Sequence, residues 1–466
     1  MKLKILLSGY VFACFSFQLA TDTHAQRAAA GAQHTVFLCQ DSIPSIWGNN
    51  VSGQLGNSTS SYRTIPAKHA TLRGITAVSA ASNFSLFLKE DGKVYATGDN
   101  QKGQLGDGTT TGRKIPAEVP GLTGVTAISA GAAHSLFLKN DGTVWACGDN
   151  TNGQLGDGTT ESRSTPVQVS SLTGIIAISA GSAHSLFLKN DSTVYACGLN
   201  LFGLLGTGKE SSVAENTPHL FPTLAGIVKI NAGQNYSLFV KGDGTAWAVG
   251  DNDYGQLGDG TSADKYAPVQ VTTLSGITDA EASHSSTSFF IKNDGTIWAA
   301  GYNGTGMFGT GVNSGFDPNP TPVQLNNLSN ITAVAAGLYH AVFINAIGTA
   351  KASGGNAQGQ LGNATTTNST SLVTVSDLCP ATVGLREVFS GNSIYVFPNP
   401  AGNYLNITSD KPFSEVRITN MLGETVYSSR SSGRSLQVDL TGHAAGVYLV
   451  QIQQAGSLST SKVIVK

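Results

Sequence analysis

Short alternating stretches of apolar and polar residues, separated by residues typical of tight turns, run through most of the chain. Residues 126–130, 134–139 and 144–147 are three such stretches in a row, and residues 166–169 form a fourth. The tripeptide Asn140-Asp141-Gly142, between the second and third stretches, is a strong β-hairpin signal. The pattern predicts four short antiparallel strands joined by tight turns.

The same unit recurs along the chain. The pattern Gly-x-Asn-x-x-Gly-x-(Leu/Phe)-Gly follows the third stretch and occurs seven times, at steps of 50, 50, 50, 52, 51 and 53 residues. Its copies begin at Gly48, Gly98, Gly148, Gly198, Gly250, Gly301 and Gly354. A four-stranded unit of this kind buries both its faces only when neighbouring copies stack against it in a ring. The sequence therefore predicts an all-β protein in which residues 26–377 form a seven-bladed β-propeller.

Several elements of the repeat occur together. In the third copy, Ala130-Gly-x-x-His-Ser135 and the pair Val144-Trp145 precede the glycine-rich motif. In combination they resemble the regulator of chromosome condensation repeat, over roughly residues 27–377, and this resemblance implies a seven-bladed propeller. The end repeats depart from it, because Ser45 and Lys351 take the place of Trp145. The departure concerns local packing and leaves the number of repeats unchanged.

A ring of blades must be closed. We expect the spare strand after the last motif, residues 371–375, or its continuation, to pair into the first blade. In the repeat frame Cys39 and Cys379 fall near the open ends of one hairpin. Either they form a disulfide that closes the ring, contributing roughly 3–5 kcal/mol in the loop-entropy model, or both thiols stay free. Cys147 and Cys197 occupy one repeat position and are expected to be buried free thiols.

A different pattern begins after a linker predicted at residues 378–389. Short alternating strands from residue 390 to 466 predict a small β-sandwich. The Pro398-Asn-Pro400 opening, the Gly446-Val-Tyr448 strand and the Lys462-x-Ile-x-Lys466 ending resemble the C-terminal sorting domain of the type IX secretion system, found in Bacteroidetes. This resemblance implies contact with that secretion machinery, then release or anchoring at the outer surface. The alternative is an ordinary adhesive sandwich.

Residues 1–25 are expected to be a secretory signal peptide. Lys2 and Lys4 precede the apolar residues 5–20, and Thr23-His24-Ala25 supplies small residues at a cleavage position. A lipoprotein signal at Cys14 is the minor alternative. We see no other segment apolar enough to span a membrane. The protein is therefore predicted to be secreted or held at the outer cell surface.

Composition and charge exclude several function classes. The 466 residues carry a formal net charge of −2, so no global basic field would hold a nucleic acid. Four histidines share one repeat slot with Phe84, Tyr236 and Thr287, which indicates a structural role for that slot. We find no zinc-type ligand pair and no lysine of a phosphate-binding loop. We predict no catalytic, cofactor-binding or metal-binding residues, and hence a protein that is not an enzyme.

Variation between repeats suggests a binding face. From the last motif glycine to the next strand-starting proline, a regular repeat takes ten steps, the fourth takes twelve and the sixth thirteen. A basic residue also recurs seven positions after that glycine in four repeats, and it serves either a structural ion pair or ligand capture. The candidate residues are Tyr62, Arg63, Arg113, Arg163, Lys209, Glu210, Lys265, Tyr266, Phe316 and Asp317.

The leading hypothesis is a non-enzymatic module that binds a protein through propeller loops. A carbohydrate-binding or carbohydrate-cleaving propeller is the first alternative, and cleavage would require two suitably spaced carboxylates. A structural component of a surface layer is the second alternative. The sequence does not name the ligand.

Overall fold

The computed structural model describes residues 28–221, 223–345, 348–379, 394–397, 404–409, 411–420, 423–430, 433–444, 446–454 and 457–465. The predicted signal peptide, residues 1–25, lies outside the described residues, as does most of the predicted linker. The chain divides into two compact units, Met1–Pro380 and Ala381–Lys466. No helix in the described ranges has the length and apolar character needed to span a membrane.

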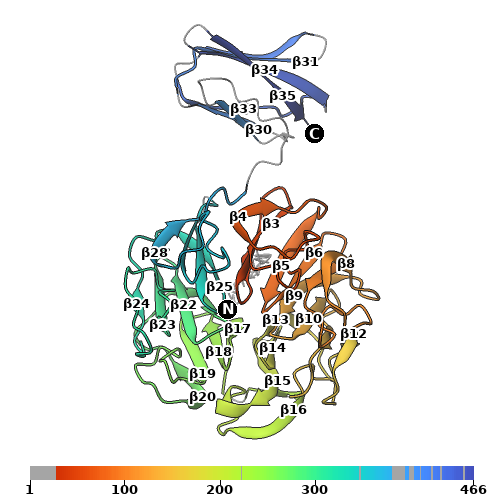
Figure 1. The fold of residues 1–466 in the computed structure, drawn as a ribbon, viewed down its shortest axis with the longest axis vertical. Coiled ribbons are helices and arrows are strands. Elements are labelled where there is room, and N and C mark those ends of the chain that lie inside the picture. Colours follow the sequence, from red (N-terminus) through yellow and green to blue (C-terminus); the bar gives the residue numbers. More distant parts are fainter. Residues whose placement is uncertain are drawn as a thin grey trace, which may run out of the picture. The chain divides into compact units, whose positions relative to one another are not determined.

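Seven four-stranded antiparallel sheets form the first unit (Figure 1). The first strand of each sheet contacts the first strands of its neighbours around the ring, and β25 contacts β1. The predicted seven-bladed propeller is confirmed. The first four blades, each from its inner strand outward, are β1 (Ala28–Ala30), β2 (His34–Leu38), β3 (Pro44–Gly48), β4 (Arg63–Lys68); β5 (Ile75–Ala81), β6 (Phe84–Lys89), β7 (Val94–Gly98), β8 (Arg113–Glu118); β9 (Val125–Ala130), β10 (His134–Lys139), β11 (Val144–Gly148), β12 (Arg163–Gln168); and β13 (Ile175–Ala180), β14 (His184–Lys189), β15 (Val194–Asn200), β16 (Ser211–Leu220).

The remaining three blades follow the same order, and the 3-10 turn η1 (Leu201–Gly203) is inserted in the fourth. They are β17 (Ile227–Ala232), β18 (Tyr236–Lys241), β19 (Ala246–Gly250), β20 (Lys265–Gln270); β21 (Ile277–Ala282), β22 (Thr287–Lys292), β23 (Ile297–Gly301), β24 (Val323–Gln324); and β25 (Ile331–Ala336), β26 (His340–Asn345), β27 (Ala350–Gly354), β28 (Ser369–Thr374).

The histidine slot joins neighbouring blades. All seven residues of this slot are fully buried at the start of the second strand. His134 Nε2 lies 3.0 Å from Ser185 Oγ of the next blade, and Tyr236 donates to the Thr287 carbonyl. Burial lowers the pKa of His134 to about 4, so the ring is neutral near pH 7. The four histidines and Tyr236 each bond to the next blade in this way, whereas Phe84 fills the slot by bulk alone. Bulk is thus what these residues have in common.

The ring does not close as the sequence predicted. β28 pairs with β27 in its own blade, so the expected pairing of this strand with the first blade is wrong. The reason is that β1 already supplies the inner strand of the first blade, which leaves no vacant position there. Every blade is therefore built from contiguous residues.

A disulfide and a hydrogen bond from a side chain to the backbone close the ring instead. Cys39 and Cys379 form a disulfide across 340 residues. Trp47 Nε1 donates to the Gln360 carbonyl at 2.8 Å, and this hydrogen bond joins the first blade to the seventh. Cys147 and Cys197 are buried free thiols.

The second unit consists of two antiparallel sheets. The first sheet contains β29 (Ile394–Phe397), β30 (Tyr404–Ser409) and β33 (Ser435–Asp439), and the second contains β31 (Glu415–Asn420), β32 (Thr425–Ser429), β34 (Gly446–Gln454) and β35 (Ser457–Val465). Leu405 and Ile407 from the first sheet share one buried cluster with Val416 and Val450 from the second. The unit is thus a small β-sandwich of the predicted kind.

Candidate binding face of the propeller

One face of the ring carries all ten candidate residues. Because the strands are antiparallel, the loops from third to fourth strands lie on the same side as the turns from first to second strands. In the third blade these are residues 149–162 and 131–133. We call the surface formed by these segments in all seven blades the loop face. The turns from second to third strands, such as Asn140-Asp141-Gly142, and the Cys39–Cys379 disulfide lie toward the opposite face.

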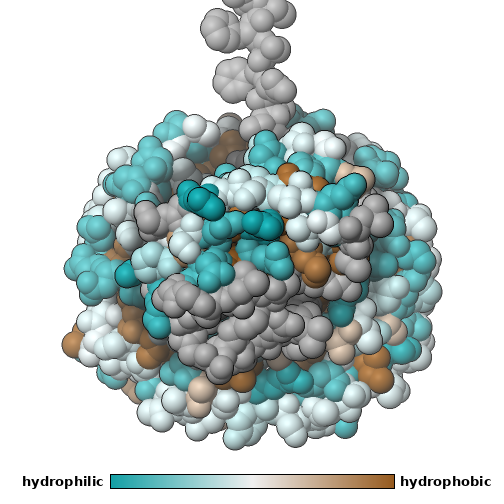
Figure 2. Space-filling model, turned by 90° about the horizontal axis from the view of Figure 1, so that it is seen from above, coloured by the Kyte–Doolittle hydropathy of each residue, from teal (hydrophilic) through white to brown (hydrophobic). Residues whose placement is uncertain are grey.

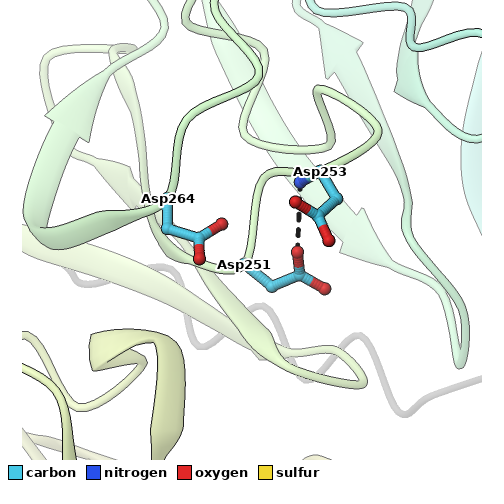
Figure 3. Close-up of side chains that lie close together, drawn as sticks. All are labelled: Asp251, Asp253 and Asp264. Carbon is cyan, nitrogen blue, oxygen red and sulfur yellow. Dashed lines mark hydrogen bonds between the residues drawn. The ribbon is translucent and has the colours of Figure 1, made fainter.

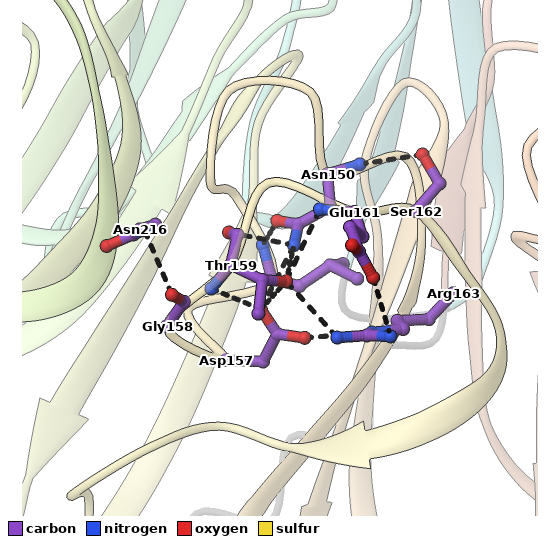
Figure 4. Close-up of polar contacts among 9 residues, drawn as sticks. Asn150, Asp157, Gly158, Thr159, Glu161, Ser162, Arg163 and Asn216 are labelled. Atoms are coloured by element: carbon purple, nitrogen blue, oxygen red, sulfur yellow. Dashed lines mark hydrogen bonds and ion pairs between the residues drawn. The ribbon is translucent and has the colours of Figure 1, made fainter.

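The glycine-rich motif organises each loop around one asparagine (Figure 4). In the third blade, Asn150 Oδ1 accepts from Leu155 N at 2.9 Å while its Nδ2 donates to Asp157 Oδ1 at 3.1 Å. The motif glycine Gly153 lies directly against the backbone of Asn216 in the next blade, and two residues after the motif Gly158 N donates to the Asn216 carbonyl at 2.9 Å. The motif therefore has a structural function, which is to hold its own loop and fix it to the neighbouring blade.

Three of the four recurring cations neutralise an acid in the same loop. Arg163 Nε lies 2.9 Å from Asp157 Oδ2, and Lys265 pairs with Asp259 at 3.1 Å. Arg113 pairs with Asp107 in the same way. Burial alone would raise the pKa of Asp157, but hydrogen bonds from Thr159 and Arg163 lower it overall. These three cations serve the structural pairing that the sequence left open.

Arg63 differs from those three. The acid position of its loop is occupied by Asn57. Across the described parts of the chain, Arg63 makes no ion pair. Tyr62 beside it is 50% exposed.

The insertion in the fourth repeat lengthens a strand. β16 is ten residues long, and Ser211 pairs with Asn200 at the end of β15. Lys209 and Glu210 are exposed just before this strand. Tyr266, at the start of β20, lies against Gly203 of this blade and keeps a partly exposed ring.

The insertion in the sixth repeat forms an irregular loop. Asn319 Nδ2 donates to the Gly301 carbonyl at 2.8 Å. In other blades the third and fourth strands pair through their backbones at this point, as Gly148 and Arg163 do. β24 is consequently only two residues long. The loop exposes Phe316, whose residue exposure of 79% is high for a large apolar side chain, and Asp317 is exposed beside it.

Phe316 belongs to a group of aromatic residues from three blades. Its ring centroid lies 6.2 Å from that of Tyr302, which lies 5.2 Å from that of Tyr254 in an edge-to-face arrangement. Burial raises the pKa of Tyr302, and the nearby hydroxyls of Tyr254 and Tyr339 raise it further. We call Tyr254, Tyr302, Phe316 and Tyr339 the aromatic cluster. Of these four, sequence reasoning identified only Phe316, although aromatic residues at variable motif positions of adjacent repeats were an available signal.

Three carboxylates lie close to one another in the fifth blade (Figure 3). Asp251, Asp253 and Asp264 have oxygens within 4.8 Å of one another, close enough to hold a cation. Two of them already cap their own loop, because Asn252 N donates to Asp264 and Asp253 N donates to Asp251. Burial raises the pKa of Asp251, and the other two carboxylates raise it further. Within the described residues this is the one such acidic group, and loop capping accounts for two of its members.

Two further acids, Asp279 and Glu281, lie on the inner strand β21. Asn231 Nδ2, on the inner strand of the fifth blade, donates to Glu281 Oε2 at 2.7 Å. Burial and the nearby Asp279 carboxylate raise the pKa of Glu281 to about 8. Glu281 therefore binds the neighbouring blade in its protonated form near neutral pH.

Two protein-family models match the chain. One, described as RCC1-like domain, matches residues 15–332, and one described as Secretion system C-terminal sorting domain matches residues 395–466. The sorting domain indicates export through the type IX system, either to the outer cell surface or into the medium.

Curated relatives resemble only part of this chain. The probable E3 ubiquitin-protein ligase HERC4 of Mus musculus is 31% identical over 256 residues, which cover 50% of this chain and 24% of HERC4. The Protein RCC2 homolog of Xenopus laevis is 32% identical over 152 residues, covering 31% of this chain and 29% of that protein. The chain thus matches less than a third of the length of either relative.

Solved structures show the same fold. Prp20p from Saccharomyces cerevisiae, reported with its binding properties to Gsp1p and histones, has a TM-score of 0.64 at 21% identity and covers 76% of this chain and 87% of Prp20p. Human WBSCR16 has a TM-score of 0.60 at 22% identity, covering 68% of this chain and 85% of that one.

Proposed function

Because this chain belongs to the RCC1-like domain family, we propose that its propeller is a non-enzymatic binding module that recognises a protein through the loop face. The chain is exported, so such a partner would be met at the outer surface or in the medium. The motif, the histidine slot and three of the four recurring cations are engaged in building the ring. The residues that remain for recognition are those that differ between the blades.

The aromatic cluster carries the proposal. Exposed aromatic rings are favoured anchors in protein interfaces, because they bury a large area at a small cost in side-chain entropy. Here, rings from the fifth, sixth and seventh blades meet on one face of a rigid scaffold, at the largest insertion in the repeat. Outside the grey atoms, the side of the molecule shown in Figure 2 is mostly teal to white, with hydrophobic residues in small separate areas.

The relatives support binding more than catalysis. Prp20p is reported with binding properties to two kinds of protein, Gsp1p and histones. HERC4 is named a probable ligase, but the matched region covers only 24% of it, so that activity is not transferred to this chain.

Carbohydrate binding is the second candidate, because aromatic rings also stack on sugars. Asp279 and Glu281 provide the two nearby carboxylates that a carbohydrate-cleaving propeller would need. Glu281, however, accepts a hydrogen bond from Asn231 of the preceding blade, which favours a structural role.

The test is capture by the full chain of surface and secreted proteins from co-resident cells. Phe316→Ala and Tyr302→Ala should each abolish capture of the specific partner. Tyr62→Ala is the matched control, because it removes an exposed aromatic of the loop face outside the cluster, and it should leave capture unchanged. Retention on a glycan array that is lost in the same two variants, with no captured protein, would reject protein recognition and support carbohydrate binding.

A further inference from the structure

In six of the seven blades, the cation and the acid of the motif loop are either both present or both absent. The second, third and fifth blades have both, as the pairs Asp107–Arg113, Asp157–Arg163 and Asp259–Lys265. The fourth, sixth and seventh blades have neither. Their acid position holds Thr207, Thr310 and Asn363, and the residue bonded to the first motif glycine, as Arg163 is to Gly148, is Glu215, Asn319 or Ser369. A cation at this position thus accompanies a carboxylate that neutralises it.

The first blade is the exception, because Arg63 is present without the acid. Asn57 keeps the structural part of the aspartate's role: its Oδ1 accepts from Asn50 Nδ2 at 2.9 Å and from Thr59 Oγ1 at 2.8 Å. The loop therefore folds as in the other blades, but the negative charge is missing. Within the described residues, no carboxylate lies within ion-pair distance of the Arg63 guanidinium.

Arg63 lines an open pocket of about 250 Å³ between the first and second blades. Ile46 and Leu55 lie at the buried side of the pocket, while Ala67 and the 60% exposed Ile115 of β8 complete an apolar lining. Pockets for drug-sized ligands measure roughly 300–1,000 Å³, so this one suits a group the size of one side chain.

His69 is a second departure from the repeat at the same pocket. Its equivalents in the second and third blades are the buried residues Val119 and Val169. His69 Nε2 donates to the Gly56 carbonyl at 2.9 Å, and Nδ1 accepts from Leu72 N at 3.1 Å. Both ring nitrogens are thus used within the protein, and the ring is neutral.

The charges around the pocket leave Arg63 as the group available to a ligand. Lys68 is paired with Asp41 at 2.5 Å. Arg73, close by, donates to the carbonyls of His69 and Leu72. The neighbourhood therefore carries excess positive charge, and the excess at the pocket itself is on Arg63.

We propose that this pocket binds a carboxylate carried on a small apolar group, with Arg63 taking the carboxylate in place of the missing aspartate. A guanidinium matches the two oxygens of a carboxylate in a planar, bidentate geometry. The apolar lining favours an organic acid over a fully hydrated inorganic anion. The carboxylate can belong to a free small acid or to the C-terminal residue of a peptide. This site is separate from the aromatic cluster, and its ligand need not be the partner of the proposed binding function.

The experiment is calorimetric titration of the full chain with three probes in a buffer free of carboxylates. The probes are benzoate, N-acetyl-Gly-Phe with a free C-terminus, and the same dipeptide amide. We expect binding of at least one of the two acids and no binding of the amide. Arg63→Gln should weaken acid binding about 10- to 100-fold, the range for loss of a charge-assisted hydrogen bond.

Asn57→Asp provides the sharper test, because it rebuilds the ion pair of the other blades and should abolish acid binding without removing any pocket group. Arg113→Gln is the matched control, since it removes an arginine already paired with an acid, and it should leave binding unchanged. Binding of benzoate alone identifies a free acid as the ligand source, and binding of the dipeptide alone identifies a peptide terminus. Equal binding of acid and amide, binding by Asn57→Asp at wild-type strength, or binding of none of the probes would overturn the proposal.

Discussion

Closure of the ring by a disulfide allows a quantitative prediction for Cys39→Ala/Cys379→Ala. The bond spans 340 residues, and the loop-entropy model gives about 6 kcal/mol for a closed loop of that size at 25 °C. That figure is an upper limit, because the variant keeps the hydrogen bond from Trp47 to the Gln360 carbonyl and the unfolded chain retains some structure. We expect a loss of roughly 3–6 kcal/mol, a large share of the ~5–15 kcal/mol typical of folded domains.

Urea unfolding with and without a thiol reductant measures this loss. Cys379 is exposed, so reductant should reach the bond and shift the wild-type midpoint toward that of the double variant. The variant itself should not respond to reductant, which controls for effects on the buried Cys147 and Cys197. An identical midpoint for wild type and variant under oxidising conditions would refute the argument that this bond holds the ring closed.

Three further predictions follow from single residues. Asn57→Asp should stabilise the protein by no more than about 1 kcal/mol in urea unfolding, because the pair it forms with Arg63 is partly exposed. Glu281→Gln should raise the melting temperature at pH 9 and have little effect at pH 4, because the raised pKa means that wild-type stability falls as pH rises from 4.5 to about 8. His134→Phe, which copies Phe84, should be tolerated at pH 7. Because it removes the titrating ring, it should also reduce the loss of stability that the wild type shows as pH falls from 6.5 to about 4. His134→Ala should instead lower the free energy of unfolding by roughly 2–4 kcal/mol, and thermal melts across this pH range would measure both effects.

The repeat pattern made most of the fold predictable. The motif asparagine acts within its own loop, as Asn150 does, so the same residue recurs wherever the same local structure recurs. The position of Cys379 in the repeat frame was also sufficient to suggest its pairing with Cys39. Closure by strand exchange was wrongly predicted, because the short strand Ala28–Ala30 carries too few residues to be recognised by alternation.

The candidate site was less predictable, because it depends on contacts between blades. Tyr302 follows Tyr254 by 48 residues and Tyr339 follows Tyr302 by 37, so only the stacking of blades brings them together with Phe316. Arg63 differs from Arg163 in lacking an acid partner in its loop. That difference could be recognised only once the folded loop showed that Asp157 is the partner of Arg163.

Site-specific photo-crosslinking tests protein recognition by the loop face most directly. A photoreactive residue would replace Phe316 in one full-length chain and, in another, Ile176, which is 56% exposed at the end of β13 toward the opposite face. Both chains would be irradiated at the surface of co-resident cells. The account predicts a discrete protein adduct from position 316 and none from position 176. Equal adducts from both positions, or none from position 316, would contradict it.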